Sequence, residues 1–327
     1  MKSAVSLFLI LIPLFLQAQE KYNRTLKLMG SRFEITVVAI NESKGNQFID
    51  MAIVEIKRIE KLISSWDQES QTSEIIRNAG VQPVKVNHEL YELIKRAIKI
   101  SELTSGAFDI TYASMDKIWK YDGSMAELPS KAEIQYSVSR VGFKNIILDP
   151  DRQTVFLKNK GMRIGFGAIG KGYAADKAKE LLMEMGVEAG IINASGDLTT
   201  WGKQPDGSPW MVGITNPLNK NKVFSWFPLD NNAVVTSGNY EKYVEINGKK
   251  YTHIIDPRTG WPASGLTSVT VFAPKAELAD ALATSVFVMG IETGIDFINQ
   301  IPGVECVIVD DQGKIFKSQN IKLNSTK

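Results

Sequence analysis

Residues 243–260 read Tyr-Val-Glu-Ile-Asn-Gly-Lys-Lys-Tyr-Thr-His-Ile-Ile-Asp-Pro-Arg-Thr-Gly and contain the strongest hairpin signal of the sequence. The pair Asn247-Gly248 favours the tight turn that joins two antiparallel strands, because both residues readily adopt positive φ angles. The stretch therefore predicts strands at residues 243–246 and 249–255, followed by a rigid turn at residues 256–260.

Further short strands are predicted on both sides of this hairpin, with helices between them. Apolar residues recur at helical spacing over residues 47–63, 89–103, 172–185 and 276–289. A turn and a short strand are expected over residues 105–111. Antiparallel hairpins with interspersed helices favour an α+β fold, with mixed and mostly antiparallel sheets, over a doubly wound parallel sheet. Residues 19–327 contain no internal repeat or linker, so we expect one compact, two-lobed unit.

Residues 1–18 are typical of a secretory signal peptide. Met1-Lys2 is followed by an apolar run from Ala4 to Leu16 and by the small residue Ala18, near which we expect cleavage. The mature chain is therefore expected to be exported, to the periplasm or another extracytoplasmic compartment, and to be soluble. No cysteine lies at this border, so lipid attachment at a lipobox cysteine is not expected.

The overall composition is that of an ordinary globular protein. Of 327 residues, 44% are hydrophobic and 23% are charged, and the net charge is only +2. This balance gives no support for a nucleic-acid-binding protein. The one cysteine, Cys306, cannot form an internal disulfide and lies in an apolar stretch, so we expect it in the core.

A glycine-rich loop at residues 165–172, Gly-Phe-Gly-Ala-Ile-Gly-Lys-Gly, precedes one predicted helix. It satisfies two phosphate-binding patterns, the dinucleotide-binding pattern G-x-G-x-x-G and the P-loop pattern G-x-x-x-x-G-K. The P-loop pattern continues with a Ser or Thr whose hydroxyl binds Mg²⁺, and Gly172 lacks this hydroxyl. The N–H groups at a helix start, together with Lys171, favour binding of an anion. The alternative is a tight glycine turn that packs the helix on a sheet, and the sequence leaves both open.

Asp280 and Thr284 are one turn apart on an alanine-rich helix and could offer two oxygen ligands to a hard cation such as Mg²⁺. Alternatively, Thr284 bonds the carbonyl of residue 280 and Asp280 caps its own helix. His253 precedes the polar turn at residues 256–260, which makes a catalytic role as plausible as a structural one. The other histidine, His88, is expected on the surface.

Taken together, the motifs resemble those of the ApbE family and occur in the same order. The resemblance rests on Gly167–Ala174 with Asp176, Ser195-Gly196-Asp197, Thr236-Ser237-Gly238, His253–Gly260 and Ala279–Thr284, and also on Met29-Gly30-Ser31 and Gly106–Thr111. It covers nearly the whole mature chain. It implies an FAD:protein FMN transferase, which uses Mg²⁺ and FAD and transfers FMN to a Thr or Ser hydroxyl of an acceptor flavoprotein. The product is a phosphoester, and AMP is released.

The same resemblance implies roles for individual residues. Asp280, Thr284 and the backbone carbonyl of Ala168 would bind Mg²⁺. Lys171 would hold the diphosphate, while His253 would act as the base and Asp256 would orient it. The residues that would contact FAD are Met29, Trp66, Ala107, Phe108, Asp109 and Ile254.

One departure from the family pattern concerns Gly165, which stands where many relatives have an acidic residue. Two other functions remain open. A Mg²⁺-dependent FAD hydrolase would give FMN and AMP with water as the acceptor, and a non-catalytic protein would only bind FAD. The acceptor flavoprotein is expected to be exported or membrane-bound, because this chain is itself expected to be exported.

Overall fold

The computed structural model describes residues 19–216, 219–240 and 242–321, so the expected signal peptide at residues 1–18 lies outside the described residues. Its centre is an eight-stranded sheet of order β1-β2-β6-β7-β10-β13-β14-β15, with every neighbouring pair antiparallel. The strands are β1 (Glu20–Leu28), β2 (Ser31–Ala39), β6 (Gly190–Ala194), β7 (Asp197–Trp201), β10 (Ala233–Gly238), β13 (Leu266–Ala273), β14 (Glu305–Asp310) and β15 (Ile315–Lys317).

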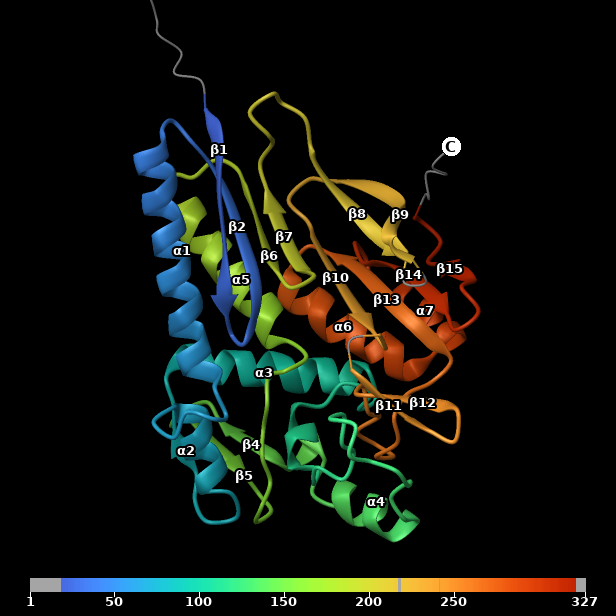
Figure 1. Cartoon of the computed structure of the whole chain (residues 1–327). Helices are drawn as coiled ribbons and strands as arrows, with labels where there is room; N and C mark the ends of the chain where they lie inside the picture. The colour runs from blue at the N-terminus through green and yellow to red at the C-terminus, as the bar shows by residue number, and fades with distance from the viewer. Residues whose placement is uncertain (1–18, 217–218, 241, 322–327) are drawn as a thin grey trace, which may run out of the picture.

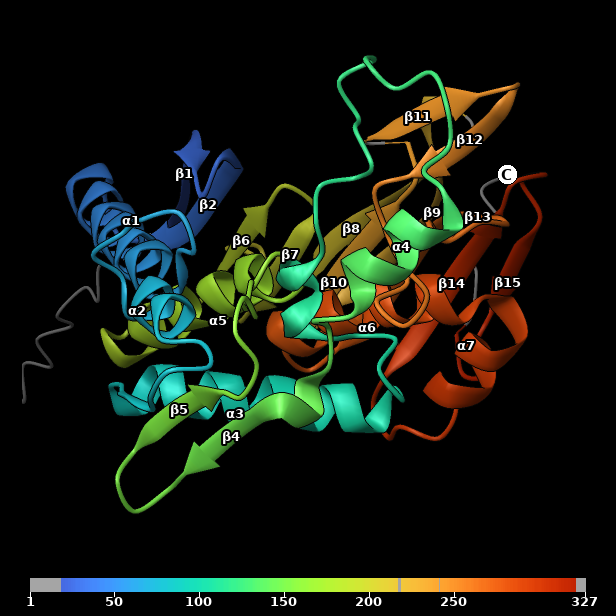
Figure 2. The ribbon, with the colours of Figure 1, turned by 90° about the horizontal axis from the view of Figure 1, so that it is seen from below.

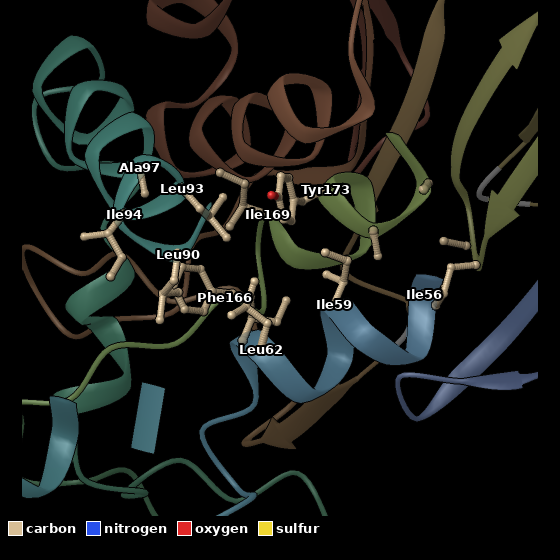
Figure 3. Packing of buried hydrophobic residues seen from close by; sticks show 14 of the residues in the cluster. Ile56, Ile59, Leu62, Leu90, Leu93, Ile94, Ala97, Phe166, Ile169 and Tyr173 are labelled. Atoms are coloured by element: carbon tan, nitrogen blue, oxygen red, sulfur yellow. The ribbon is translucent and has the colours of Figure 1, made fainter. Parts of the chain in front are cut away.

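Three helices cover one face of this sheet: α1 (Glu42–Ile63), α5 (Gly170–Glu184) and α6 (Ala276–Met289) (Figure 1). A fourth helix, α3 (His88–Leu103), runs below them (Figures 1 and 2). Ile59 and Leu62 of α1 meet Leu90 of α3 in a shared apolar core, with Ile169 beside them (Figure 3). The smaller helical segments are α2 (Gln71–Arg77), η1 (Ile110–Ser114), α4 (Lys131–Val138), η2 (Phe143–Asn145) and α7 (Ile291–Ile298).

Smaller sheets complete the fold. The ribbon of β8 (Trp210–Asn216) and β9 (Asn219–Leu229) covers the opposite face, where Trp210 packs against Val38, Leu198 and Val234. The other sheets are β3-β5-β4, formed by Val84–Lys85, Thr154–Leu157 and Ile146–Asp149, and the hairpin of β11 (Tyr243–Ile246) and β12 (Lys249–Thr252). Within the described ranges, no helix is long and apolar enough to cross a bilayer.

The prediction of an α+β fold with mostly antiparallel sheets is confirmed. Asn247 and Gly248 have positive φ angles of 52° and 74°, as the predicted hairpin turn requires. The prediction that the second strand continues to residue 255 is wrong, because β12 ends at Thr252 and leaves His253 in the following loop. Cys306 is buried in β14, as predicted.

The short strand predicted at residues 105–111 is also absent. The chain there forms a turn and then the 3₁₀ helix η1. Asp109 caps this helix, because its side chain accepts hydrogen bonds from both the backbone N–H and the hydroxyl of Thr111. Capping of this kind competes with an extended strand, so local hydrogen bonding overrides the strand signal.

Helices α5 and α6 pack very closely at Gly172. A Cβ atom at this position would overlap the backbone carbonyl of Ala276 at the start of α6. One turn later, the carboxylate of Asp176 accepts the backbone N–H groups of Ala276 and Glu277, at 3.0 and 2.9 Å. A carboxylate there satisfies N–H groups that a helix start leaves without partners. The two helices are thereby held in fixed register.

Gly172→Ala should lower the free energy of unfolding by about 1–3 kcal/mol, the usual cost of overpacking a core. A backbone carbonyl cannot turn aside as a flexible side chain could, so α5 and α6 have to separate. Chemical denaturation measures the change. Glu184→Ala, at an exposed site of the same helix, is the control and should change stability by less than about 0.5 kcal/mol. Wild-type stability of Gly172→Ala would contradict the close packing.

Candidate active site

Most of the site residues predicted from the sequence line one cavity of about 270 Å³. They come from segments that are far apart in the chain: Ala107, Phe108, Asp109, Ala168, Lys171, His253, Ile254, Asp280 and Thr284. A larger cavity of about 1350 Å³ is lined by Met29 and Trp66. The two cavities adjoin, because both are lined by Tyr112, Gly167 and Lys171.

Asp280 is a deeply buried acid of the site, with 4% of its surface exposed. Its Oδ2 accepts the backbone N–H of Gly172 at 3.2 Å. Burial raises the pKa of Asp280 well above its usual value, and the charge of Asp197 and a hydrogen bond with that residue raise it further. Lys171 and the N–H of Gly172 act in the opposite direction. Asp280 therefore belongs to a group of charges that interact with one another, and it does not cap its own helix.

Lys171 contacts the second acid of this group. Its Nζ lies 2.5 Å from Oδ2 of Asp197, which is 2% exposed and lies at the start of β7. Two buried carboxylates therefore face one ammonium group. Asp197 belongs to the motif Ser195-Gly196-Asp197, for which no role was predicted from the sequence. Its position directly after a glycine turn at a strand end was the available signal.

Both interpretations of the glycine-rich loop describe part of the structure. The loop is a tight packing turn, since a Cβ atom on Gly170 would lie 2.7 Å from the side chain of Ile63. The N-terminus of α5 also binds an anion, but that anion is the carboxylate of Asp280 in this chain. The N–H of Gly172 is thus already engaged before any ligand binds.

Thr284 lies one turn beyond Asp280 and faces the end of β10. Its Oγ1 is 3.4 Å from Oγ of Ser237. Among the described residues, that hydroxyl is its hydrogen-bond partner, and the alternative bond to the carbonyl of Asp280 is not formed. The Thr284 oxygen therefore lies toward the cavity that Asp280 also lines.

His253 is oriented by the backbone of a neighbouring segment. Its Nδ1 is 3.0 Å from the carbonyl oxygen of Lys242, and the ring of Tyr121 approaches it edge-on, with centroids 6.5 Å apart. A carbonyl can only accept a hydrogen bond, so this contact places the proton of a neutral imidazole on Nδ1. The other ring nitrogen, Nε2, is then able to accept a proton.

Asp256 has a different partner from the one expected. Its carboxylate forms two hydrogen bonds of 2.9 Å with the guanidinium group of Arg258 and accepts the backbone N–H of the same residue. It lines neither cavity. Asp256 therefore stabilises the turn after His253, and the expectation that it orients the imidazole is corrected.

The remaining predicted residues divide between the two cavities. Asp109 accepts the backbone N–H of Phe143 at 2.9 Å in addition to its bonds with Thr111. Burial raises its pKa, and its side chain is already occupied by protein donors. Trp66 is 76% exposed, and Nζ of Lys117 lies 4.8 Å from its ring centre. The indole face is thus presented at the rim of the larger cavity.

Sequence reasoning missed the contribution of residues 113–140, which carry no recognisable pattern. Nε1 of Trp119 donates to the carbonyl of Gly260, and the hydroxyl of Tyr121 donates to the carbonyl of Thr252, both at 2.9 Å. These bonds hold the loop that contains His253 at both of its ends. Aromatic residues with polar tips in a segment of unclear structure were the signal for such a role.

Gly165 has little room for a larger side chain. A Cβ atom at this position would lie 3.0 Å from Cβ of Ala113 and 3.6 Å from the hydroxyl oxygen of Tyr112. An acidic side chain at this position would have to displace these neighbours.

Comparison with known proteins identifies the family of this chain. Residues 29–308 match the ApbE family. The chain belongs to the ApbE family. An FAD:protein FMN transferase of Klebsiella pneumoniae (strain 342) is 30% identical over 304 residues, which cover 92% of this chain and 93% of that protein. An FAD:protein FMN transferase of Treponema pallidum (strain Nichols) is 31% identical over 317 residues, covering 92% and 88%.

Solved ApbE structures share the fold. The crystal structure of the ApbE protein of Thermotoga maritima has a TM-score of 0.84 and 32% identity, over 92% of this chain and 97% of that chain. The apo structure of the Pseudomonas stutzeri flavinyl transferase ApbE has a TM-score of 0.82 and 25% identity, over 94% and 97%. The family and the fold predicted from the sequence motifs are therefore confirmed.

Proposed function

We propose that this ApbE-family chain transfers the FMN half of FAD to a Thr or Ser hydroxyl of an acceptor flavoprotein. The hydroxyl oxygen forms a bond to the FMN phosphorus, the bond from that phosphorus to the AMP oxygen breaks, and AMP leaves. The observation that carries the proposal is a single cavity with an oriented histidine, a lysine and buried oxygen donors. The names of the relatives support the same reaction.

The donor set of the cavity fits Mg²⁺. Asp280 would bind it through a carboxylate, Thr284 through a hydroxyl and Ala168 through its carbonyl, and hard cations prefer such oxygen ligands. Burial and the charge of Asp197 raise the pKa of Asp280, and a bound Mg²⁺ would stabilise the ionised form of this carboxylate. When bound, Mg²⁺ would neutralise charge on the phosphate oxygens. No cluster of three or more His, Cys, Asp or Glu side chains suited to a metal occurs among the described residues.

The chain's own residues account for the other steps. Nε2 of His253 takes the proton of the incoming hydroxyl, since Nδ1 is engaged by the carbonyl of Lys242. Lys171 places a positive charge where the two cavities meet and so holds the diphosphate. Transfer of a phosphoryl group depends mainly on such positioning and charge neutralisation.

The names of the relatives favour transfer to a protein over simple hydrolysis. We also propose that residues 1–18 direct export, that residues 19–327 form the catalytic domain, and that the acceptor is exported or membrane-bound. The apolar run near the N-terminus supports this location.

Incubation of the wild-type protein with FAD, Mg²⁺ and a candidate exported flavoprotein tests the reaction. The acceptor should gain the mass of FMN minus water, and AMP should appear in equal amount. Replacing the acceptor's Thr or Ser by Ala should remove the gain. AMP release at an unchanged rate without any acceptor would identify a hydrolase instead, and no AMP under any condition would identify a binding protein.

Asp280→Ala should abolish Mg²⁺-dependent AMP release and strongly weaken Mg²⁺ binding measured by calorimetry. It removes the anionic ligand, on which binding of a hard cation depends most. Thr284→Val is the matched comparison and should reduce Mg²⁺ affinity less, because a neutral hydroxyl is the weaker ligand. Undiminished AMP release by metal-depleted Asp280→Ala after Mg²⁺ is restored would rule out this metal site.

His253→Ala should slow FMN transfer by about 10²–10⁴-fold, the usual effect of losing a general base, with FAD binding little changed. Single-turnover kinetics give the rate, and flavin fluorescence gives the affinity. His88→Ala is the control, because His88 is exposed and its Nδ1 contacts Gln153. A collapse of FAD affinity with a normal rate per bound FAD would make His253 a binding residue.

A further inference from the structure

Tyr112 stands where the two cavities meet. It lies in the 3₁₀ helix η1 and lines both cavities, as do Gly167 and Lys171. None of the roles derived above involves this residue. A dinucleotide that occupied both cavities would place its diphosphate, which links its two halves, at this junction.

The position of Tyr112 is fixed by the chain that passes beside it. The N–H of Gly165 donates to the carbonyl of Ile110 at 2.8 Å. Ser114 forms two bonds with the backbone of Arg163, accepting its N–H at 2.8 Å and donating to its carbonyl at 2.9 Å. Hydrogen bonds at both ends of η1 therefore hold Tyr112 against the loop that leads to Ala168.

The phenol oxygen lies directly over Gly167. A Cβ atom on Gly167 would be 2.5 Å from it, so only glycine leaves room for the hydroxyl. Burial raises the pKa of Tyr112, the N–H of Gly167 opposes the rise, and the charge of Asp280 adds to it. The phenol therefore keeps its proton at neutral pH. Within the described part of the chain, no acceptor receives that proton, so the O–H is available to a ligand.

We propose that Tyr112 binds the diphosphate of FAD, with its O–H donating a hydrogen bond to a phosphate oxygen where the two cavities meet. This inference rests on the proposed function only in taking FAD as the ligand. Lys171 lines the same junction and supplies positive charge. Because Asp197 and Asp280 are close by, a phosphate there needs donors as well as a cation, and a neutral hydroxyl adds one without adding charge.

The test compares two ligands that differ only in the diphosphate. ADP and adenosine are titrated by calorimetry, at fixed Mg²⁺, into the wild-type protein, Tyr112→Phe and the control Tyr136→Phe, whose side chain is exposed. Tyr112→Phe should weaken ADP binding by about tenfold, the usual effect of losing a hydrogen bond to a charged group. Its adenosine affinity should match that of the wild type. Tyr136→Phe should leave both affinities unchanged.

Tyr112→Met, which also lacks the hydroxyl, should show the same selective loss and serves if the Phe variant is unstable. Equal weakening of ADP and adenosine would mean that Tyr112 only supports the loop, and this would overturn the inference. So would unchanged ADP affinity in both variants, or no ADP binding by the wild type. A selective loss in a protein that transfers no FMN would leave the inference intact and refute the proposed function instead.

Discussion

The packing of α5 against α6 is the constraint on which the site depends. Hydrogen bonds join the two helices in both directions. The N–H of Gly172 in α5 donates to the carboxylate of Asp280 in α6, and the carboxylate of Asp176 in α5 accepts two N–H groups from the start of α6. The missing side chain of Gly172 allows this approach. Because Lys171 adjoins Gly172, and Thr284 is one turn from Asp280, the same contact sets the distance between the lysine and the oxygen donors.

The charge balance of the cavity follows from this arrangement. Asp197 and Asp280 are both buried, and one lysine lies beside them. Buried carboxylates are costly unless they are paired or protonated, and the pKa of Asp280 is raised accordingly. An ionised Asp280 would need a cation beside it and would repel a diphosphate. A bound cation, Lys171 and neutral donors such as Tyr112 together would make the cavity suited to one.

His253 is held in place by contacts other than the packing of α5 against α6. His253 lies just beyond the end of β12, in a loop whose ends are bonded to Trp119 and Tyr121. The carbonyl of Lys242 fixes the ring through Nδ1. The carbonyl of Lys242 and aromatic side chains thus orient His253, while the carboxylate of Asp256 stabilises the turn.

The sequence by itself determined much of the local structure and pointed to residues that line one cavity. The Asn247-Gly248 turn and the helix at residues 276–289 were predicted correctly. Both are determined by residues that are close together in the chain, and a local sequence pattern includes all of these residues. The family motifs pointed to His253 and Asp280, and both residues line the same cavity. Where strand and cap signals competed, as at Asp109, a local hydrogen bond decided the outcome, and the pattern gave the wrong element.

Only the tertiary structure decided which groups meet. The partner of Asp280 is an N–H 108 residues away, and that of Lys171 is a carboxylate 26 residues away. Such pairs depend on the strand order and on the approach of two helices, which no local spacing encodes. For the same reason the family resemblance led to an expected contact between Asp256 and His253 that is not the one observed, and no role was predicted for Tyr112. The function of each side chain follows from the residues that the fold brings against it.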